Sequence, residues 1–421
     1  MKRKKGRYQH NDKKTVNREY MSYEDVPIKD YDSNEIVSKN LTKKFLKVFL
    51  ILFISVAALL ALMNIEYLTP ENISHWFQYD LLGKSEGNGY PVRFSGTNIS
   101  TNNFELMDGV PVYCSDTSIV VLNSNAGEYQ NRQHAFASPV LKTNSGYSIV
   151  YNIGATGYKI INRTDMVYSD STKQKIFSAD ICSNGVYALL TSGDDYLAKL
   201  SVYRSDNLEK YAYSFADYYV NNVSLNKYGN RAVVSGVSSK NGGLTSVIYI
   251  LDFSKKNYLQ KYEIDDSYIY DVCYLNNGNA IAVGENSLYY INVDKNSKSD
   301  ISYENKVLTT YTLDRDFGLL ISLSKNPDGR ECDISRFDSD GKMDIKFSTG
   351  TKISSLDFYD NKIASLSQSN INIYDNTGKS ISSIETNADT RKICFINSNT
   401  MYILGKNEIS VMNIDYTVSD K

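Results

Sequence analysis

Two hydrophobic patterns divide the chain. Residues 48–65, VFLILFISVAALLALMNI, form one run without a charged residue. From residue 90 onward, short runs rich in β-branched and aromatic residues alternate with turns of Gly, Asn, Asp and Ser, and no helical periodicity extends beyond about two turns. The first pattern predicts a membrane-spanning helix, and the second predicts an all-β domain.

The apolar run is long enough to cross a membrane. With Phe45 and Leu46 ahead of it, it approaches the roughly 20 apolar residues that a span needs. It is apolar on every face, which argues against a buried helix in the core of a soluble protein. More than forty residues precede it, which argues against a cleaved signal peptide. We therefore expect a signal anchor over residues 45–65.

The charges beside this run predict its orientation. Residues 1–47 carry 13 Lys and Arg against 7 Asp and Glu, and the first basic residue after the run is Lys84. The positive-inside rule places the N-terminus in the cytoplasm and the chain after residue 65 outside the cell. Residues 1–44 are predicted to be a disordered basic tail that acts as an orientation signal. Attraction to anionic lipid or to a cytoplasmic partner is the alternative.

A short connection follows the predicted span. Thr69-Pro70-Glu71 has the residues of a helix start, and the helix would end near Leu82. Trp76, the only tryptophan, would lie at the membrane interface. Residues 83–89, GKSEGNG, are typical of a flexible linker, so residues 66–89 are expected to form a juxtamembrane helix and linker.

One unit recurs eight times after residue 90: a strand, a tight turn and a strongly apolar strand. The copies read LMDG-VPVYC, LKTNSG-YSIVYN, ICSNG-VYALLT, LNKYG-NRAVVSG, LNNG-NAIAVG, DRDFG-LLISLS, FYDN-KIASLS and INSN-TMYILG. Their turns are marked by Gly109, Gly146, Gly185, Gly229, Gly278, Gly318, Asn361 and Asn399, which lie 37 to 49 residues apart. Gly and Asn tolerate the positive φ angles of hairpin turns, so each copy predicts an antiparallel pair.

The repeats predict a β-propeller. Each copy continues into a third and a fourth strand, and four antiparallel strands in roughly 40 residues are typical of one propeller blade. The last copy ends near Ile414 after three strands, and residues 90–95 form an isolated strand before the first copy. We expect this early strand to complete the last blade. The prediction is an eight-bladed β-propeller over residues 90–414, with seven blades as the alternative and residues 415–421 as a C-terminal tail.

The cysteines favour a packing role. Cys182, Cys273 and Cys394 occupy the same position in three copies, just before the first turn. Such positions lie farther apart around a ring than the ~7 Å Cα separation that a disulfide allows, so we expect small buried hydrophobic residues. The chain has five cysteines, and because this number is odd they cannot all pair in disulfides. We assign no role to Cys114 and Cys332.

Two segments resemble the start of a calcium-binding loop. Phe337 to Lys342 (FDSDGK) lacks the later acidic ligands and the closing Glu of such a loop. Asp375 to Lys379 (DNTGK) falls at the equivalent place in the next copy. Both are predicted to be hairpin turns between the outer two strands of a blade.

Charge and histidine content limit the chemistry. After residue 47 the chain carries 33 basic and 41 acidic residues, which argues against nucleic acid as a partner. His10 and His75 precede the propeller, so His134 is the only histidine within it. A single histidine argues against a conventional His-centred triad and against a metal site with several His ligands. The acid pairs Asp194/Asp195 and Asp265/Asp266 could act as acids and bases in the channel, but solvated loops are the favoured interpretation. We assign no catalytic, cofactor-binding or metal-binding residue.

Several stretches resemble a known family. They are Gly89–Val92 (GYPV), Ser138–Leu141 (SPVL), Ser148–Tyr151 (SIVY), Asn184–Thr191 (NGVYALLT) and Tyr196–Tyr203 (YLAKLSVY). They resemble a domain-of-unknown-function family of single-pass membrane proteins from Gram-positive anaerobes. The resemblance implies an extracytoplasmic propeller of the quinoprotein or WD40-like type and no catalytic residues. Quinone-dependent dehydrogenases and outer-membrane assembly lipoproteins are more distantly similar, but residues 90–421 lack the former's docking tryptophans.

These features predict a non-enzymatic binding or scaffolding module at the cell membrane, without a cofactor. Its expected partner is an envelope protein or a glycan. One alternative is a hydrolase or lyase that acts on envelope polysaccharide with carboxylates of the channel. Another is a transmembrane sensor with the propeller outside and the basic tail inside.

Overall fold

The computed structural model describes residues 44–56, 58–59 and 87–416. The chain divides into two compact units, Met1–Thr69 and Pro70–Lys421. In the first unit, residues 44–56 and 58–59 are helical. Within the described part of the chain, no helix has both the length and the apolar character needed to span a bilayer. The rest of the predicted span, the basic tail and the predicted helix with Trp76 lie outside the described residues.

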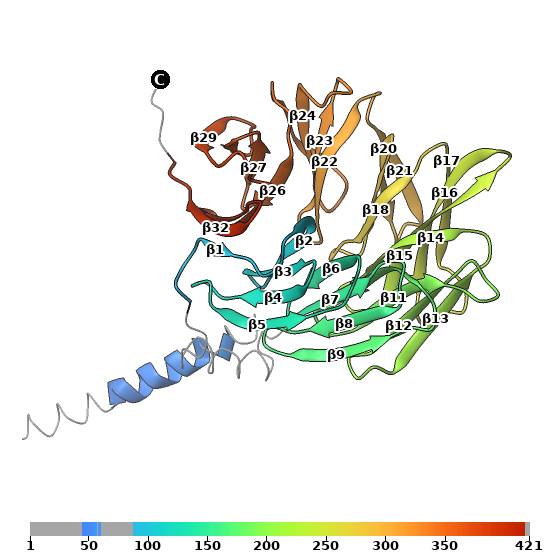
Figure 1. The fold of residues 1–421 in the computed structure, drawn as a ribbon, viewed down its shortest axis with the longest axis horizontal. Coiled ribbons are helices and arrows are strands. Elements are labelled where there is room, and N and C mark those ends of the chain that lie inside the picture. Colours follow the sequence, from blue (N-terminus) through green and yellow to red (C-terminus); the bar gives the residue numbers. More distant parts are fainter. Residues whose placement is uncertain (1–43, 57, 60–86, 417–421) are drawn as a thin grey trace, which may run out of the picture. The chain divides into compact units, whose positions relative to one another are not determined.

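Within the second unit, the described residues form eight four-stranded antiparallel sheets, the blades, which follow one another around a ring (Figure 1). Blades 1 to 4 comprise β2 (Ile99–Met107), β3 (Val110–Ser115), β4 (Ser118–Leu122), β5 (Glu128–Gln133); β6 (Pro139–Asn144), β7 (Tyr147–Asn152), β8 (Gly157–Ile161), β9 (Met166–Ser171); β10 (Ile176–Ile181), β11 (Tyr187–Ser192), β12 (Ala198–Tyr203), β13 (Glu209–Phe215); β14 (Tyr219–Leu225), β15 (Arg231–Lys240), β16 (Gly243–Asp252) and β17 (Gln260–Asp265). Blades 5 to 7 comprise β18 (Ile269–Tyr274), β19 (Ala280–Gly284), β20 (Ser287–Asn292), β21 (Ser297–Ser302); β22 (Val307–Asp314), β23 (Gly318–Ser324), β24 (Cys332–Phe337), β25 (Met343–Ser348); β26 (Ser355–Tyr359), β27 (Lys362–Ser367), β28 (Asn370–Tyr374) and β29 (Ser380–Glu385).

The eighth blade joins the two ends of the repeat region. It contains β30 (Lys392–Asn397), β31 (Thr400–Leu404), β32 (Glu408–Asn413) and the early strand β1 (Val92–Arg93). Val92 pairs with Ile409 and Arg93 with Glu408, so β1 runs antiparallel to β32. The early strand therefore completes the last blade. The eight-bladed prediction is confirmed, and the seven-bladed alternative is wrong.

The predicted positive φ occurs at the marked residue of the first turn in every blade except the last. In blade 1, Asp108 (φ 48°) and Gly109 (φ 79°) form a two-residue turn between paired Met107 and Val110, as a type I′ hairpin requires. All six marked glycines and Asn361 have a positive φ. Asn399 does not, so that part of the prediction is wrong: its N–H is instead held by Oδ1 of Asn397 (2.9 Å).

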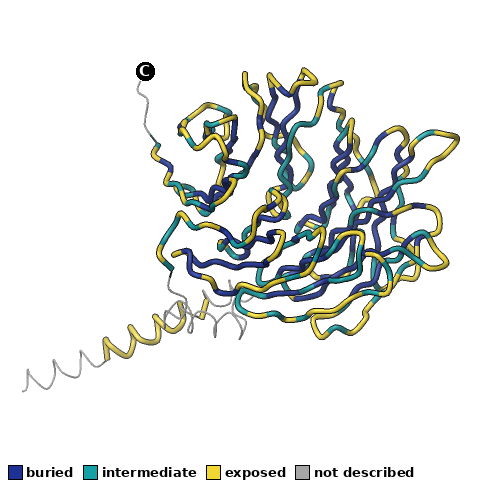
Figure 2. The backbone as a smooth tube through the Cα atoms, in the orientation of Figure 1, coloured by how far each residue is buried: buried dark blue, intermediate teal, exposed yellow. Residues whose placement is uncertain are grey.

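The hydrophobic core consists of eight clusters, each lying between two neighbouring blades. The inner strands are buried on both faces, and every residue of β23 is buried. This explains why the second strand of each copy is a continuous apolar run and not an alternating one. Figure 2 shows the strand interiors buried and the turns at their ends exposed.

The antiparallel order of the strands gives the ring two different faces. One face, here called the hairpin face, carries two turns of each blade: the turn between its first and second strands and the turn between its third and fourth strands. The opposite face, here called the crossover face, carries the turn between the second and third strands and the connections between blades. Each connection is therefore assigned to a face by its place in the strand order.

Closure of blade 8 predicts a sharp contrast between two positions of β32. Ile409 is 0% exposed and packs in the cluster between blades 8 and 1, whereas Val411 on the same strand is 36% exposed. We expect Ile409→Ala to lower the free energy of unfolding of the full chain by about 2–4 kcal/mol in urea denaturation. Val411→Ala, the matched control, should cost less than about 0.5 kcal/mol. Equal losses for the two variants would mean that this seam does not stabilise the ring.

Candidate functional site

The channel at the centre of the ring is lined by the first strand of every blade. Each first strand pairs with the second strand of its own blade, and at every junction except that of blades 5 and 6 it also contacts the first strand of the next blade. Its other edge therefore has no strand partner in its own sheet. Backbone N–H groups on that edge must find other acceptors, because an unpaired buried N–H is costly.

Carboxylates of the preceding blade supply acceptors for three of these N–H groups. The bonds join Thr143 N to Glu105 Oε2 (2.8 Å), Leu225 N to Asp180 Oδ2 (2.6 Å) and Phe395 N to Asp357 Oδ2 (2.5 Å). Each acid lies on the first strand of one blade, and each amide lies on or at the end of the first strand of the next. The acids therefore join neighbouring blades directly.

Neutral side chains do the same between blades 4 and 5, and a second time at the junctions of blades 1 and 2 and of blades 7 and 8. Their bonds join Leu141 N to Asn103 Oδ1 (2.9 Å), Tyr274 N to Ser224 Oγ (3.1 Å) and Ile393 N to Ser355 Oγ (3.3 Å). One arrangement thus occurs at four of the eight junctions, between blades 1 and 2, 3 and 4, 4 and 5, and 7 and 8. A polar side chain on one innermost strand accepts the N–H of the next innermost strand.

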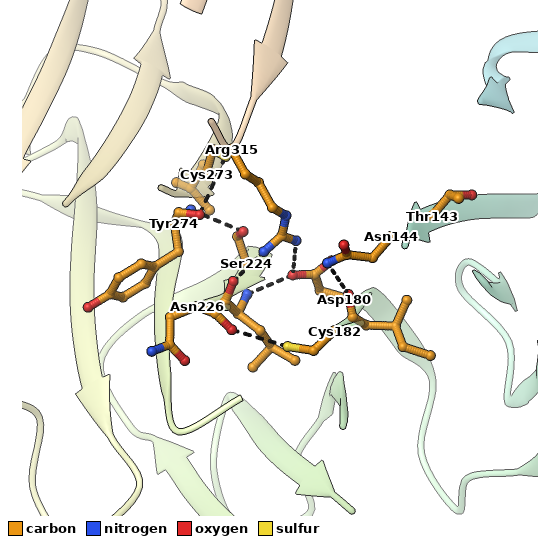
Figure 3. Close-up of polar contacts among 12 residues, drawn as sticks. Thr143, Asn144, Asp180, Cys182, Ser224, Asn226, Cys273, Tyr274 and Arg315 are labelled. Carbon is orange, nitrogen blue, oxygen red and sulfur yellow. Dashed lines mark hydrogen bonds and ion pairs between the residues drawn. The ribbon is translucent and has the colours of Figure 1, made fainter. Parts of the chain in front are cut away.

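Arg315 connects blades that are not neighbours. It lies in the first turn of blade 6, and its Nη2 contacts Asp180 Oδ2 in blade 3 (2.7 Å) while its Nη1 donates to the carbonyl of Leu225 in blade 4 (Figure 3). Asp180 is buried, and the same Oδ2 atom accepts the N–H of Leu225. The guanidinium neutralises a carboxylate that already joins blades 3 and 4. It therefore ties three blades together at the hairpin end of the channel.

Two lysines add positive charge to the channel. Lys392 Nζ in blade 8 donates to the carbonyls of Thr101 (3.0 Å) and Phe104 (2.7 Å) in blade 1, across the seam where the ring closes. Lys142 lies on β6, and the negative charge of Asp271 raises the pKa of its ammonium group, against the opposing effect of burial. The channel therefore contains mixed charges and has no single dominant sign.

The channel acids are engaged in backbone contacts, which limits what they can do chemically. Burial raises the pKa of Asp357 to about 6, the kind of shift that suits a general acid, but its Oδ2 accepts the N–H of Phe395. Oδ1 of Asp271 accepts the N–H of Val272 (2.9 Å). The arrangement can hold blades together. Among the channel acids named above, all in the described part of the chain, no two carboxylates are both free of such bonds.

The acid pairs singled out from the sequence lie elsewhere. Asp194 and Asp195 are exposed in the connection between β11 and β12, and Asp265 and Asp266 are exposed at the end of β17. All four are on the crossover face, in agreement with the solvated-loop interpretation. Glu105, Asp180, Asp271 and Asp357 were not singled out from the sequence. Their signal was an acidic residue four to seven positions before the marked turn residue of its copy.

The two calcium-like segments are hairpin turns, as predicted. Oδ1 of Asp338 accepts the N–H groups of Asp340 and Lys342 (both 2.9 Å), and Oδ1 of Asp375 accepts those of Thr377 and Lys379 (2.8 and 3.0 Å). Their carboxylates therefore stabilise the turns. Among residues 44–56, 58–59 and 87–416, no group of three or more His, Cys, Asp or Glu could hold a metal ion.

All five cysteines are free thiols and buried, which confirms the packing role expected for Cys182, Cys273 and Cys394. Burial raises the pKa of each of these three thiols to about 12. At neutral pH they are protonated and therefore poor nucleophiles.

A cysteine and a histidine that the sequence did not connect lie together in blade 1. Sγ of Cys114 is 3.4 Å from Nε2 of His134, within the range of a nucleophile–base pair. However, Nε2 also lies 3.0 Å from the carbonyl of Ser115, and Nδ1 accepts the N–H of Phe136 (3.1 Å). This fixes Nε2–H as a donor and leaves no ring nitrogen to take the thiol proton. Burial raises the pKa of Cys114 to about 12 and lowers that of His134, so the pair is suited to packing.

Comparison with known protein families assigns the propeller to a family. A family model described as a family of unknown function, DUF5711, matches residues 87–414, which is the whole propeller. The chain belongs to the DUF5711 family. The resemblance to a domain-of-unknown-function family is thereby confirmed, whereas the membrane span and a Gram-positive source remain predictions. No curated protein sequence matches this DUF5711 chain.

Solved structures share the fold at low sequence identity. A structure described as the eukaryotic initiation factor is 12% identical with a TM-score of 0.53, covering 78% of this chain and 87% of its own. The C-terminal WD40 domain of Sif2 is 11% identical with a TM-score of 0.51, covering 78% and 99%. BamB from Moraxella catarrhalis is 11% identical with a TM-score of 0.50, covering 79% and 98%. These similarities establish a propeller of the WD40 and BamB type for this DUF5711 chain.

The Arg315 contact predicts a large loss of stability when it is removed. Arg315→Met should lower the free energy of unfolding of the full chain by about 3–5 kcal/mol in urea denaturation, because Asp180 would keep a buried charge without its cation. Arg330→Met is the matched control: Arg330 also pairs with an aspartate, but its side chain is 74% exposed. Its loss should stay below about 1 kcal/mol. Similar losses for the two variants would show that Arg315 does not hold the blades together.

Proposed function

We propose that this DUF5711 chain is a membrane-anchored binding or scaffolding module without enzymatic activity. Residues 45–65 would hold it in the cell membrane, and the propeller would lie outside and bind an envelope protein or a glycan. The observation that carries the proposal is the use of the channel charges. Glu105, Asp180, Asp357 and Arg315 connect blades, so the outer faces of the ring remain the surfaces for recognition.

The way the ring is held together supports a binding role. Hydrophobic clusters at all eight junctions and hydrogen bonds between innermost strands make the ring a preorganised platform. A preorganised surface loses little entropy when it binds a partner. Similarity to the WD40 domain of Sif2 and to BamB is consistent with such a module, although at this identity it supports the fold alone.

The described part of the N-terminal helix supports the anchor. Its aromatic side chains Phe45, Phe49 and Phe53 are 79%, 63% and 62% exposed. Large apolar side chains exposed along one helix are costly in water and are stabilised in lipid. Together with the basic residues before the run, this supports an N-terminus in the cytoplasm and a propeller outside.

Cross-linking in native membranes tests the binding role. Tagged full-length protein would be cross-linked through its lysines, purified and analysed by mass spectrometry. We expect one envelope protein in stoichiometric amount, linked to lysines after residue 86. If no protein is linked and purified envelope glycans also fail to bind the chain, the binding role is wrong.

Protease treatment of intact cells is the matching control for topology. External protease should degrade the propeller and spare a tag placed before residue 45. A propeller that is degraded only after the membrane is opened would place it on the inner side and refute the proposed topology.

A further inference from the structure

A cavity opens on the crossover face of blade 8, beside the seam where the ring closes. Three connections line it: residues 94–98 between β1 and β2, residues 386–391 between β29 and β30, and residues 405–407 between β31 and β32. Its volume is about 450 Å³, within the range of roughly 300–1,000 Å³ that is typical of small-molecule sites. We call it the seam cavity. Six of its seven lining residues are polar: Thr97, Asn98, Asp389, Thr390, Arg391 and Lys406.

The seam cavity carries charges of both signs. Its cations are the half-buried Arg391 and the exposed Lys406, and its anion is the exposed Asp389. Among residues 44–56, 58–59 and 87–416, none of these three side chains forms an ion pair. Nη1 of Arg391 donates to Oδ1 of Asn98 (3.2 Å), which is a neutral acceptor and leaves the charge of the guanidinium uncompensated. Charges of both signs therefore remain available to a ligand.

The spacing of Asp389 and Arg391 would allow them to pair with each other. Asp328 and Arg330 also lie two positions apart in a connection of the crossover face, and Oδ2 of the acid is 2.7 Å from Nη2 of the base. In the seam cavity the same two residue types, with the same spacing, stay apart. A ligand that carries both charges would compensate the two groups at once.

Hydrogen bonds hold the walls of the seam cavity in place. The backbone N–H of Arg391 donates to the carbonyl of Leu404 (2.8 Å), which joins two of the three connections. In the third connection, the N–H and Oγ1 of Thr97 donate to the two carboxylate oxygens of Asp116 (2.9 and 2.7 Å). Asp116 is thereby engaged in supporting the wall. A cavity with fixed walls loses little entropy when it binds a ligand.

We propose that the seam cavity binds a small zwitterion of the α-amino acid class. The ligand's carboxylate accepts hydrogen bonds from the guanidinium of Arg391 and is attracted by the ammonium group of Lys406. The ligand's own ammonium group donates to the carboxylate of Asp389. A simple anion would leave Asp389 uncompensated, and a simple cation would leave both bases uncompensated.

This inference goes beyond the proposed function. It assigns a second, small ligand to one place on the ring, and it does not depend on which envelope protein or glycan the propeller binds. Its success or failure is therefore independent of the cross-linking experiment.

Isothermal titration calorimetry of the full-length protein in detergent tests the inference. The first probes are the standard L-amino acids, each titrated separately. For the tightest binder, its N-acetyl derivative removes the positive charge and its methyl ester removes the negative charge. Glucuronate, a sugar with a carboxylate and no ammonium group, tests for an acidic glycan instead.

The test variants are R391M and D389N. The matched controls are R330M and D328N, which remove the same two charges from a connection of the same face in blade 6. We expect R391M and D389N each to weaken binding of the amino acid about tenfold or more, because each removes a charge-assisted hydrogen bond. The control variants should change the affinity by less than about twofold, since their charges lie in another blade.

The derivatives distinguish direct contact from a damaged fold. D389N should leave binding of the N-acetyl derivative unchanged, and R391M should leave binding of the methyl ester unchanged. Each derivative lacks the group that the substituted residue binds, so the two losses are not additive. A variant that fails to fold would instead weaken the binding of every probe.

Three results would overturn the inference. The first is that no amino acid binds, and the second is that the control variants weaken binding as much as R391M and D389N do. The third is that glucuronate binds more tightly than any amino acid and depends on Arg391 but not on Asp389. That result would make the seam cavity a site for acidic sugars.

Discussion

The innermost strand of a propeller blade has a free edge, and this ring depends on how that edge is satisfied. One edge pairs with the second strand, while the other faces the channel and the next blade. A polar side chain of one blade accepts the N–H of the next, as Glu105, Asp180 and Asp357 do. An acceptor in that position is hydrogen-bonded and buried or half-buried, so its loss would leave the N–H that it accepts without this partner. This need explains why charged and neutral polar residues occur on the innermost strands.

The same constraint decides what the channel is for. A carboxylate that holds a neighbouring backbone amide is fixed in place and has little freedom to bind a substrate. Arg315 makes similar connections between blades that are not adjacent, because it lies in the first turn of blade 6 and contacts Asp180 in blade 3 and Leu225 in blade 4. The channel charges therefore act as connections between blades. We therefore expect recognition to use the two faces of the ring.

Much of the fold could be predicted because it depends on local patterns. The recurring turn, the apolar second strand and the missing fourth strand of the last copy together predicted eight blades closed by a strand in residues 90–95, where the structure has β1 (Val92–Arg93). Asn399 was misassigned because Asn is compatible with several turn geometries, and Asn397 supplies the stabilising contact there. The Cys114–His134 contact and the Arg315 contact were not predictable, because each depends on how distant segments are brought together by the ring.

In this account, charged side chains in the channel hold the ring together, and the two faces of the ring bind the partner. The central claim is that the channel carboxylates bind backbone amides of neighbouring blades. Hydrogen exchange of the amides of Thr143, Leu225 and Phe395 in the native full-length protein tests it most directly. The account predicts that all three exchange as slowly as amides paired within the blades, because each is bonded to a carboxylate. Exchange within seconds, as at an open strand edge, would contradict it and would return these acids to the list of groups free to act in the channel.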